Sequence, residues 1–233
     1  MKVAIVTGGH AFDESAFLRL FTSVRGITCT HLPQSDESEV FEEIGAWPYD
    51  VIVLYALTQK ISEKRRDNFL RLLDNGVGVL SLHHASCAFQ EWSEYPKIIG
   101  CRYLLSPVER EGVRREPSTY QHDVSIPVHV TDPAHAVVRG VRDFVVRDET
   151  YKGCEFEPDN HLLLATTEKS SDEPLGWART YRRSRVVHFQ LGHGPDIFEN
   201  ERFRLLVAQA VQWCAEGRRE QTPREQNSRR SGQ

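Results

Sequence analysis

The first half of the chain alternates between short, almost wholly apolar runs and segments with helical spacing. The apolar runs cover residues 3–7, 27–32, 50–55 and 77–82. After the first run, apolar residues from Phe17 to Val24 recur at the spacing of one helix face, and Asp13 stands where an N-cap is expected. A weak helix is expected at 37–44 and a charged one from Ser62 to Asn75. Continuously apolar strands separated by helices indicate a parallel sheet covered on both faces.

The second half of the chain has a different pattern. Residues 122–130 alternate apolar and polar side chains, as expected of a strand with one exposed face. Further strand-like runs lie at residues 162–166, 175–181 and 185–191. Asn200 is the expected N-cap of a last helix, whose apolar stripe runs from Phe203 to Cys214. Residues 91–121 are the least regular part, and we interpret them as an insertion that shapes one wall of a cleft.

These patterns predict one α/β domain over residues 1–216, built on a mainly parallel central sheet. A length of 233 residues suits one large domain better than two. After Gly217 the chain is rich in Arg, Gln and Ser and almost devoid of apolar side chains. Residues 217–233 are therefore expected to form a disordered polar tail.

Composition narrows the range of partners. The net charge of −4 argues against nucleic acid or an anionic membrane surface as the main partner. No apolar stretch approaches the ~18 residues of a transmembrane helix, and the N-terminal apolar run is too short for a secretory signal. The five cysteines are scattered without a CxxC pair, which indicates reduced thiols and a cytoplasmic location. The oligomeric state stays open, a homo-oligomer included.

Two adjacent histidines end the last apolar run of the first half, in Leu82-His83-His84-Ala85. In open α/β folds, ligands and catalytic groups gather beyond the carboxyl ends of the strands. His83 is therefore a candidate general acid/base and His84 a candidate substrate ligand, because imidazole exchanges protons near neutral pH. The alternative, equally weighted, is a buried histidine that makes only structural hydrogen bonds.

Another histidine follows a strand in Gly192-His193-Gly194-Pro195-Asp196. Flanking glycines allow a sharp turn and a close approach to a ligand, so His193 is a second acid/base candidate. Asp196 either orients His193 or begins the next helix. Gln190, just before this loop, is a candidate for binding substrate hydroxyls.

Two more segments carry polar candidates. Gly8-Gly9-His10 follows the first strand, where the N–H groups of a glycine turn can face an anion, although a plain turn is an equal alternative. Asp148-Glu149-Thr150-Tyr151 combines carboxylates with a tyrosine, as in sites that recognise sugar hydroxyls, and the alternative is a solvated acidic face. The candidates are Glu149 as a further acid/base and Gly8, Gly9, His10 and Tyr151 as substrate-binding residues.

Histidines from different loops could also converge on a Zn²⁺ ion with an open coordination position. The candidate ligands are His83, His84 and His193, with His10 as a further one. Their spacing matches no recognised ligand motif. The main expectation is therefore that no cofactor is needed, and zinc is the alternative.

Four stretches together resemble the ThuA-like (trehalose utilisation) family. They are Leu82-His83-His84-Ala85, the segment from Asp132 to Gly140, Asp148-Glu149-Thr150-Tyr151, and Gly192-His193-Gly194-Pro195-Asp196 followed by Phe198-Glu199-Asn200. The resemblance spans residues 2 to 215, and Ala136 departs from the proline more usual at that position. It implies a flavodoxin-like, class I glutamine amidotransferase-like fold: a three-layer sandwich with a mainly parallel sheet.

Comparison with the amidotransferases of that superfamily implies a changed site. His83 falls where those enzymes have their nucleophilic cysteine, His193 near their triad histidine and Asp196 near their triad acid. Glutaminase activity is therefore not expected, because a thioester requires a thiol at the corner. Cys87 lies about a helical turn further on and is expected to be poorly placed for that role.

The resemblance also implies a role in sugar catabolism, with a small-molecule sugar or 3-keto sugar as substrate and a sugar dehydrogenase of the same pathway as a partner. The leading hypothesis is an enzyme in which His83 and His193 exchange protons with an oxidised sugar, supporting isomerisation or elimination. The rival is a non-catalytic sugar-binding or regulatory protein that has lost the nucleophile. The leading hypothesis requires the two rings to lie within roughly 12 Å, the reach of a ligand held by ~3 Å hydrogen bonds.

Overall fold

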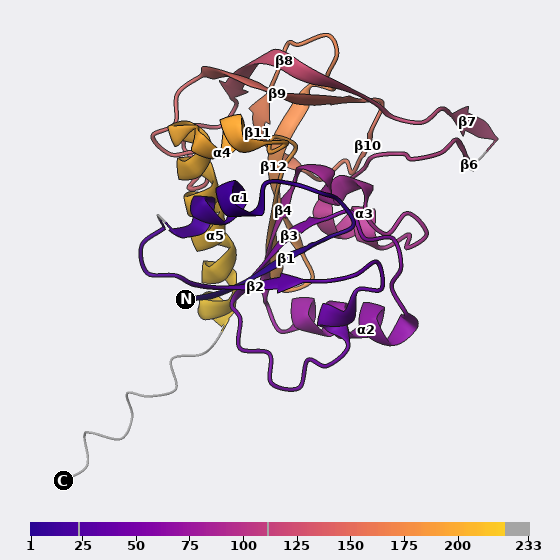
Figure 1. The fold of residues 1–233 in the computed structure, drawn as a ribbon, viewed down its shortest axis with the longest axis vertical. Helices are drawn as coiled ribbons and strands as arrows, with labels where there is room; N and C mark the ends of the chain where they lie inside the picture. Colours follow the sequence, from indigo (N-terminus) through magenta and orange to yellow (C-terminus); the bar gives the residue numbers. More distant parts are fainter. Residues whose placement is uncertain (23, 111, 222–233) are drawn as a thin grey trace.

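The computed structural model describes residues 1–22, 24–110 and 112–221, whose arrangement is shown in Figure 1. A nine-stranded sheet runs through the molecule in the order β2-β1-β3-β4-β13-β12-β11-β8-β9. Its strands are β1 (Lys2–Gly8), β2 (Thr28–Pro33), β3 (Val51–Ala56), β4 (Gly78–Leu82), β8 (Thr119–Val130), β9 (Phe144–Lys152), β11 (His161–Ala165), β12 (Pro174–Tyr181) and β13 (Ser184–Phe189).

The sheet changes character at β13. Every pair from β2 to β13 is parallel, and every pair from β13 to β9 is antiparallel. The α/β class and the flavodoxin-like arrangement expected from the sequence are confirmed, with the parallel strands at one end of the sheet. We call the strands from β2 to β13 the parallel half and those from β12 to β9 the antiparallel half.

Helices cover both faces of the parallel half, so the domain has three layers. The helical elements are α1 (Glu14–Thr22), η1 (Glu39–Phe41), α2 (Glu63–Asp74), η2 (His83–Cys87), α3 (Tyr95–Ile99), α4 (Pro195–Glu199) and α5 (Glu201–Gln221). Val51 and Val53 of β3 share a buried cluster with residues of α1, α4 and α5, whereas Ile52 and Leu54 share one with α2 and α3. Successive residues of β3 thus face opposite layers, as the pleat of a strand requires.

The expected helix starts are confirmed by their caps. Asp13 accepts a hydrogen bond of 2.8 Å from the backbone N–H of Ala16 at the start of α1. Ser62 is the N-cap of α2, and the side-chain oxygen of Asn200 accepts from the N–H of Phe203 at the start of α5. Polar side chains of this kind satisfy donors that have no partner within the helix.

Two expected segments differ from the structure. The helix expected at 37–44 is reduced to the 3₁₀ turn η1, because Ser38 has a left-handed φ of 60° and cannot belong to a right-handed helix that starts at 37. The last helix continues beyond Gly217 to Gln221, so the expected polar tail begins as helix. The rest of that tail, residues 222–233, lies outside the described residues.

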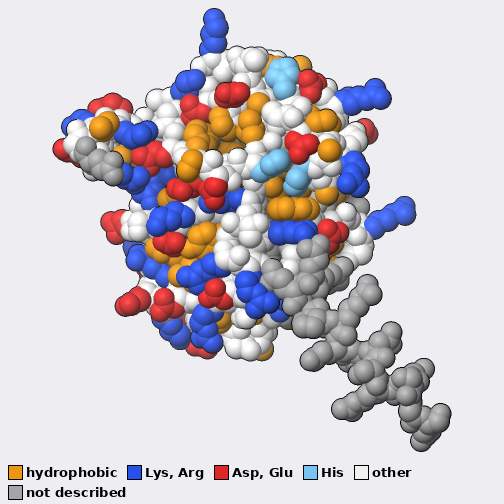
Figure 2. All heavy atoms as spheres, turned by 180° about the vertical axis from the view of Figure 1, so that it is seen from behind, with side chains coloured by type: hydrophobic (Ala, Val, Ile, Leu, Met, Phe, Trp, Pro, Cys, Tyr) orange, Lys and Arg blue, Asp and Glu red, His pale blue; other side chains and the backbone are white. Residues whose placement is uncertain are grey.

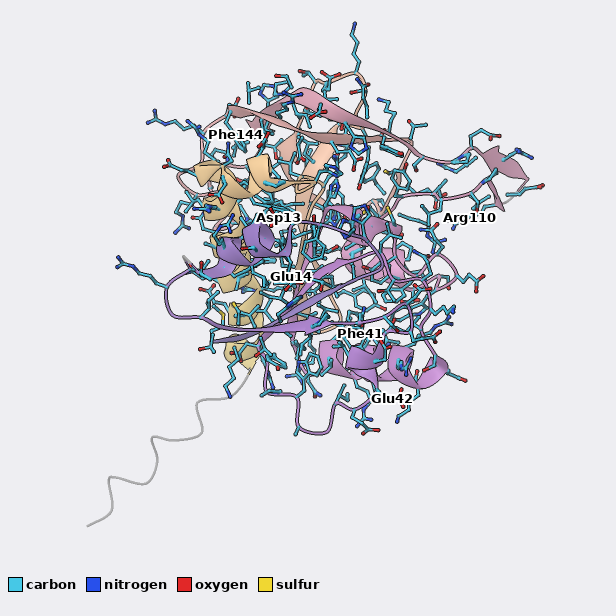
Figure 3. The ribbon with its side chains drawn as sticks, in the orientation of Figure 1. Asp13, Glu14, Phe41, Glu42, Arg110 and Phe144 are labelled. Carbon is cyan, nitrogen blue, oxygen red and sulfur yellow. The ribbon has the colours of Figure 1, made fainter. Side chains whose placement is uncertain are left out.

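The least regular segment of the sequence forms short elements at one end of the molecule. These are α3, the strands β5 (Cys101–Arg102), β6 (Val108–Arg110) and β7 (Val113–Arg115), and the beginning of β8. β5 pairs with β10 (Glu155–Phe156), and β6 pairs with β7 in a hairpin that projects from the body, where Figure 3 labels Arg110.

Acidic and basic side chains are interspersed over the face drawn in Figure 2, with no broad field of one sign. This agrees with the small net charge of the sequence. Among the helices of the described residues, none combines the length and the apolar character that a membrane span requires.

Candidate functional site

A pocket of about 220 Å³ opens beyond the carboxyl ends of the parallel strands. Turns after β1, β3, β4 and β13 meet there with side chains of β8 and β9. Its lining residues are His10, Leu57, His83, His84, Cys87, Tyr103, Leu105, Tyr120, His122, Glu149, Tyr151 and His193. The pocket is therefore walled mainly by imidazole, phenol and one carboxylate.

His83 stands at the corner where β4 ends. Its backbone φ of 49° lies in the left-handed region, which is unfavourable for a residue with a side chain. Its buried ring is held by Nδ1, which lies 2.7 Å from the carbonyl oxygen of Gln190. Because a carbonyl oxygen can only accept, Nδ1 carries a proton, and the opposite nitrogen, Nε2, faces Glu149 and Tyr151.

Glu149 connects the histidines. Its Oε2 atom lies 2.9 Å from Nε2 of His83 and 3.4 Å from Nδ1 of His193, and its Oε1 atom lies 3.1 Å from Nδ1 of His122. The ring centroids of His83 and His193 are 5.4 Å apart, well within the separation that the acid/base hypothesis requires. The carboxylate is buried, so these imidazoles provide most of its polar surroundings.

The pKa values of this group follow from burial and mutual charge. Burial alone would raise the pKa of Glu149, but its hydrogen bond to His83 and the charges of His83, His193 and His122 outweigh burial and lower it. Burial lowers the pKa of His193 and outweighs the opposing carboxylate of Glu149. At neutral pH the arrangement therefore favours an ionised Glu149 and a neutral His193.

His122 reaches Glu149 through an irregularity in β8. The register between β8 and β9 shifts between Gln121 and Val124, so that His122 and Asp123 together stand opposite Glu149. Asp123 has a φ of 59°, and the arrangement is a β-bulge, a feature that often redirects side chains next to active sites. The sequence analysis missed His122 as a site residue, because a bulge interrupts the alternation from which the face of a strand residue is inferred.

The loop that carries His193 is fixed by Asp148. The Oδ2 atom of Asp148 accepts the N–H of Gly192 at 2.7 Å, and Oδ1 accepts the N–H of His193 at 3.0 Å. Tyr55 donates its hydroxyl to the carbonyl of Gly192 at 2.8 Å. Burial raises the pKa of Asp148, although His83 and these two N–H groups act in the opposite direction. Asp148 is thus a positioning residue that the sequence analysis did not single out.

His84 forms a second polar wall with His10. Its buried ring lies between His10, at 4.7 Å between centroids, and Tyr55, at 4.2 Å. Burial lowers the pKa of His84 well below its ordinary value, the charges of His83 and His10 add to this, and the backbone of Tyr55 opposes it. Among the described residues neither ring nitrogen of His84 has a hydrogen-bond partner of normal geometry. The neutral imidazole thus has one donor and one acceptor without such a partner, both on buried atoms of a residue that lines the pocket.

Tyr151 and Cys87 lie on the same side of the pocket. The hydroxyl of Tyr151 is 3.0 Å from Nε2 of His83, and the two rings are stacked with centroids 4.9 Å apart. Cys87, expected to be poorly placed for the role of a nucleophile at the corner, lies at the end of η2 and lines the pocket. Burial raises the pKa of its thiol to about 12, so the thiol stays protonated near neutral pH and is a weak nucleophile.

The two glycines of the first turn are not among the residues that line the pocket. A Cβ atom on Gly8 would lie 2.4 Å from the carbonyl oxygen of Gln34, and one on Gly9 would lie 2.7 Å from the carbonyl carbon of Leu57. Their function in the fold is to let the turn pack against neighbouring loops, which brings His10 to the pocket.

The structure also decides the roles of Asp196 and Gln190. Of the two roles considered for Asp196, it has that of beginning the next helix, whereas Gln190 is not among the residues that line the pocket. Asp196 is exposed in the first turn of α4 and does not line the pocket, so Glu149 is the acid that lies against the ring of His193. Gln190 is buried behind the pocket wall, where its side-chain amide donates to the backbone carbonyl of Glu149 at 3.0 Å. Gln190 therefore positions His83 and Glu149 rather than facing the pocket.

His83, Glu149 and His193 could together hold a metal ion. In the part of the chain that the structure describes, one potential ligand atom from each lies within 4.8 Å of the other two. The set predicted from the sequence had His84 in place of Glu149. His84 packs against His10 and Tyr55 instead, because adjacent residues at the end of a strand point in different directions.

The similarity to known proteins extends over nearly the whole domain. A family model described as trehalose utilisation matches residues 2–214. Comparison with curated proteins finds no match. Among solved structures, a ThuA-like protein from Parabacteroides merdae superposes with a TM-score of 0.73 at 18% identity, covering 93% of this chain and 90% of the other.

Two further structures share the fold. A cytoplasmic protein from Salmonella typhimurium gives a TM-score of 0.64 at 15% identity, over 92% of this chain and 99% of the other. A protein from Thermoplasma acidophilum that is named after GMP synthase gives a TM-score of 0.55 at 14% identity, over 95% of this chain and 97% of the other. At such identities these similarities establish the architecture alone.

Proposed function

The chain belongs to the trehalose-utilisation (ThuA) family, and from this premise we propose that it acts on a sugar or 3-keto sugar by proton transfer in the histidine-lined pocket. The observation that carries the proposal is the buried carboxylate of Glu149 in contact with the imidazoles of His83 and His193. Carboxylate and imidazole are the side chains that most often exchange protons with substrates near neutral pH.

The proposed chemistry is the removal and return of a proton beside a carbonyl group. A keto group acidifies the neighbouring C–H, so a positioned base can support isomerisation or elimination without a redox cofactor. In this proposal Glu149 and His193 exchange protons with the sugar carbon and oxygen, and His83 acts with them. The carbonyl oxygen of Gln190 accepts a hydrogen bond from the proton-bearing Nδ1 of His83. The nitrogen of His83 that takes part in proton exchange is therefore Nε2.

Hydroxyl groups of the sugar are assigned to the opposite wall. His84 and Tyr151 line the same pocket, and His10 stacks on His84. Burying a polar atom without a hydrogen-bond partner costs folding free energy, and the two ring nitrogens of His84 have no partner of normal geometry among the described residues. A ligand that reached these nitrogens with a donor and an acceptor would therefore be favoured.

Glutaminase activity is not part of the proposal. A thioester mechanism requires a thiolate nucleophile, whereas burial keeps the thiol of Cys87 protonated and an imidazole occupies the corner after β4. A cytoplasmic location and a sugar dehydrogenase that supplies the keto sugar complete the proposal. The second candidate, a sugar-binding protein without catalysis, is supported by the nitrogens of His84, which have no hydrogen-bond partner of normal geometry in the described part of the chain.

The test is turnover of a 3-keto-disaccharide by the full chain and by three variants, His83→Asn, His193→Asn and Glu149→Gln. Loss of one positioned acid or base is expected to lower kcat by 10²–10⁴-fold. The matched control is His129→Asn, which replaces a half-exposed histidine in the same strand as His122 that pairs with Asp143, and it should retain parental turnover. Unchanged rates in all three variants would refute the catalytic proposal, and sugar binding without turnover in the parent would establish the binding protein instead.

A further inference from the structure

We propose that Nε2 of His83, a carboxylate oxygen of Glu149 and Nδ1 of His193 form a site for a divalent transition-metal ion, with Zn²⁺ as the best-suited ion. This goes beyond the proposed function, which requires no ion. Two imidazoles and one carboxylate form a recurrent ligand set for such ions, both in catalytic zinc sites and in two-histidine, one-carboxylate iron sites.

The ligand atoms are already gathered. Zinc binds nitrogen and oxygen ligands at about 2.0–2.2 Å, so two ligands of one tetrahedral or octahedral ion lie roughly 3.0–3.6 Å apart. Oε2 of Glu149 lies 2.9 Å from the nitrogen of His83 and 3.4 Å from that of His193. The separation of the two imidazole nitrogens is also within 4.8 Å, so small side-chain rotations would complete the triangle.

Outer hydrogen bonds hold these ligands as they do in metal sites. A metal-binding histidine characteristically donates its other ring N–H to a carbonyl or carboxylate, which fixes the ring and its tautomer. Nδ1 of His83 lies 2.7 Å from the Gln190 carbonyl oxygen, which holds a proton on that nitrogen. Nε2, which donates to Glu149 when no ion is bound, becomes the ligand when an ion displaces its proton. The backbone of His193 is held by Asp148, and the second carboxylate oxygen of Glu149 contacts His122.

The site keeps an open side. All three ligands line the pocket of about 220 Å³, so an ion held by them would retain coordination positions facing that space. Three protein ligands with an open position are typical of catalytic rather than structural zinc. The Tyr151 hydroxyl, 3.0 Å from Nε2 of His83, would have to turn from that nitrogen toward an oxygen bound to the ion.

An ion at this position would change the chemistry of the pocket. It would polarise a carbonyl oxygen and lower the pKa of a bound water molecule. It would also occupy the lone pairs of His83 and His193, so the proton acceptor in the loaded protein would be ion-bound water rather than a free imidazole. Only this consequence for turnover rests on the proposed function; the site itself does not.

The test is calorimetric titration of Zn²⁺ into the full chain after removal of metals with a chelator. One ion per chain is expected, with a dissociation constant below ~10 µM, and Mg²⁺, which prefers oxygen ligands, should not compete. His83→Asn, His193→Asn and Glu149→Gln should each weaken binding at least ~100-fold, since even outer-shell changes weaken metal affinity by 10–100-fold. His84→Phe and His129→Asn should bind within about threefold of the parent.

Parental affinity in any of the three ligand variants would overturn the proposal, and so would a parent that binds no Zn²⁺ at that concentration. Circular dichroism checks that each variant is folded. A second readout on the parent needs no variant: an ion that binds the folded chain should raise its melting temperature as the ion concentration rises. The zinc titration contains no sugar, so its result does not depend on the proposed function. A chain that binds zinc but does not turn over the keto sugar would refute the proposed function and leave the metal site standing.

Discussion

The two halves of the sheet contribute to the pocket in different ways. The parallel half supplies His10, His83, His84 and His193, all of which follow the carboxyl end of a strand. The antiparallel half supplies His122, Glu149 and Tyr151, all of which lie within strands. The pocket therefore lies at the junction of the two halves, where the loop after β13 is held by β9.

The difference follows from what covers each half. The inner strands of the parallel half, β1, β3, β4 and β13, are almost wholly buried, as β3 is at all six positions. On these strands a polar side chain can reach solvent only near the end of the strand. Antiparallel strands can present one polar face along their length. A site at the junction combines the fixed corners of one half with the carboxylate of the other.

The largest effects are expected from one substitution in each half, chosen so that both lower the free energy of unfolding by a similar amount but only one lowers turnover. Asp148→Ala removes the acceptor of two backbone N–H groups and should lower the free energy of unfolding by about 3 kcal/mol. It should also lower keto-sugar turnover by about 100-fold, because His193 loses its fixed position. Ile52→Ala, in the core of β3, should cost about 3 kcal/mol of stability yet leave turnover per folded molecule nearly unchanged.

Denaturant unfolding gives the first quantity of each variant, and turnover measured where both are folded gives the second. Equal losses of turnover in Asp148→Ala and Ile52→Ala would contradict this comparison. They would show that residues within the strands of the two halves do not differ in their contribution to activity.

A histidine buried within a strand of the parallel half should make the stability of the fold depend on pH. His188 of β13 is buried, lies 2.9 Å from the Ser81 hydroxyl and stacks on Trp177. Burial, with a smaller effect of His83, lowers its pKa to about 3. Between pH 6.5 and 3 the unfolded chain thus binds a proton that the folded chain excludes, and stability falls as the pH falls through this window.

By pH 4 the contribution of His188 to this loss should be about 3 kcal/mol, and at pH 7 it should vanish. His188→Gln keeps a partner for Ser81 without a titratable ring, so its stability should depend less steeply on pH than that of the parent. Parallel stability curves for parent and variant from pH 7 to 4 would show that His188 is not excluded from protonation.

The smallest effect is expected at the bulge of the antiparallel half. The His122 side chain is half exposed; its Nδ1 lies 3.1 Å from Oε1 of Glu149 and its ring packs against those of His193 and Tyr120. Because the ion pair is partly solvated, His122→Gln should change the free energy of unfolding by less than about 1 kcal/mol. Turnover should fall by about tenfold, because Glu149 loses one of the imidazoles that hold it. A loss as large as that of Glu149→Gln would place His122 among the groups that exchange protons with the substrate.

The sequence by itself determined the order of the elements and the corners of the site. Apolar runs and helical spacing are local properties, and so are the caps at Asp13, Ser62 and Asn200, which the structure bears out. The positions of His83 and His193 directly after strand-like runs were enough to single out both as site candidates, and in the structure their rings do meet.

Only the tertiary structure decided which groups complete the site. The sequence left open whether Asp196 orients His193 or begins the next helix. In the structure the ring of His193 lies against Glu149, a residue brought there by the pairing of β9 with β8. The bulge that directs His122, the neighbours of His84 and the clamp made by Asp148 likewise depend on strand register and loop contacts between residues far apart in the chain. Local patterns of hydrophobicity fix secondary structure, but they carry no information about which register these distant segments adopt.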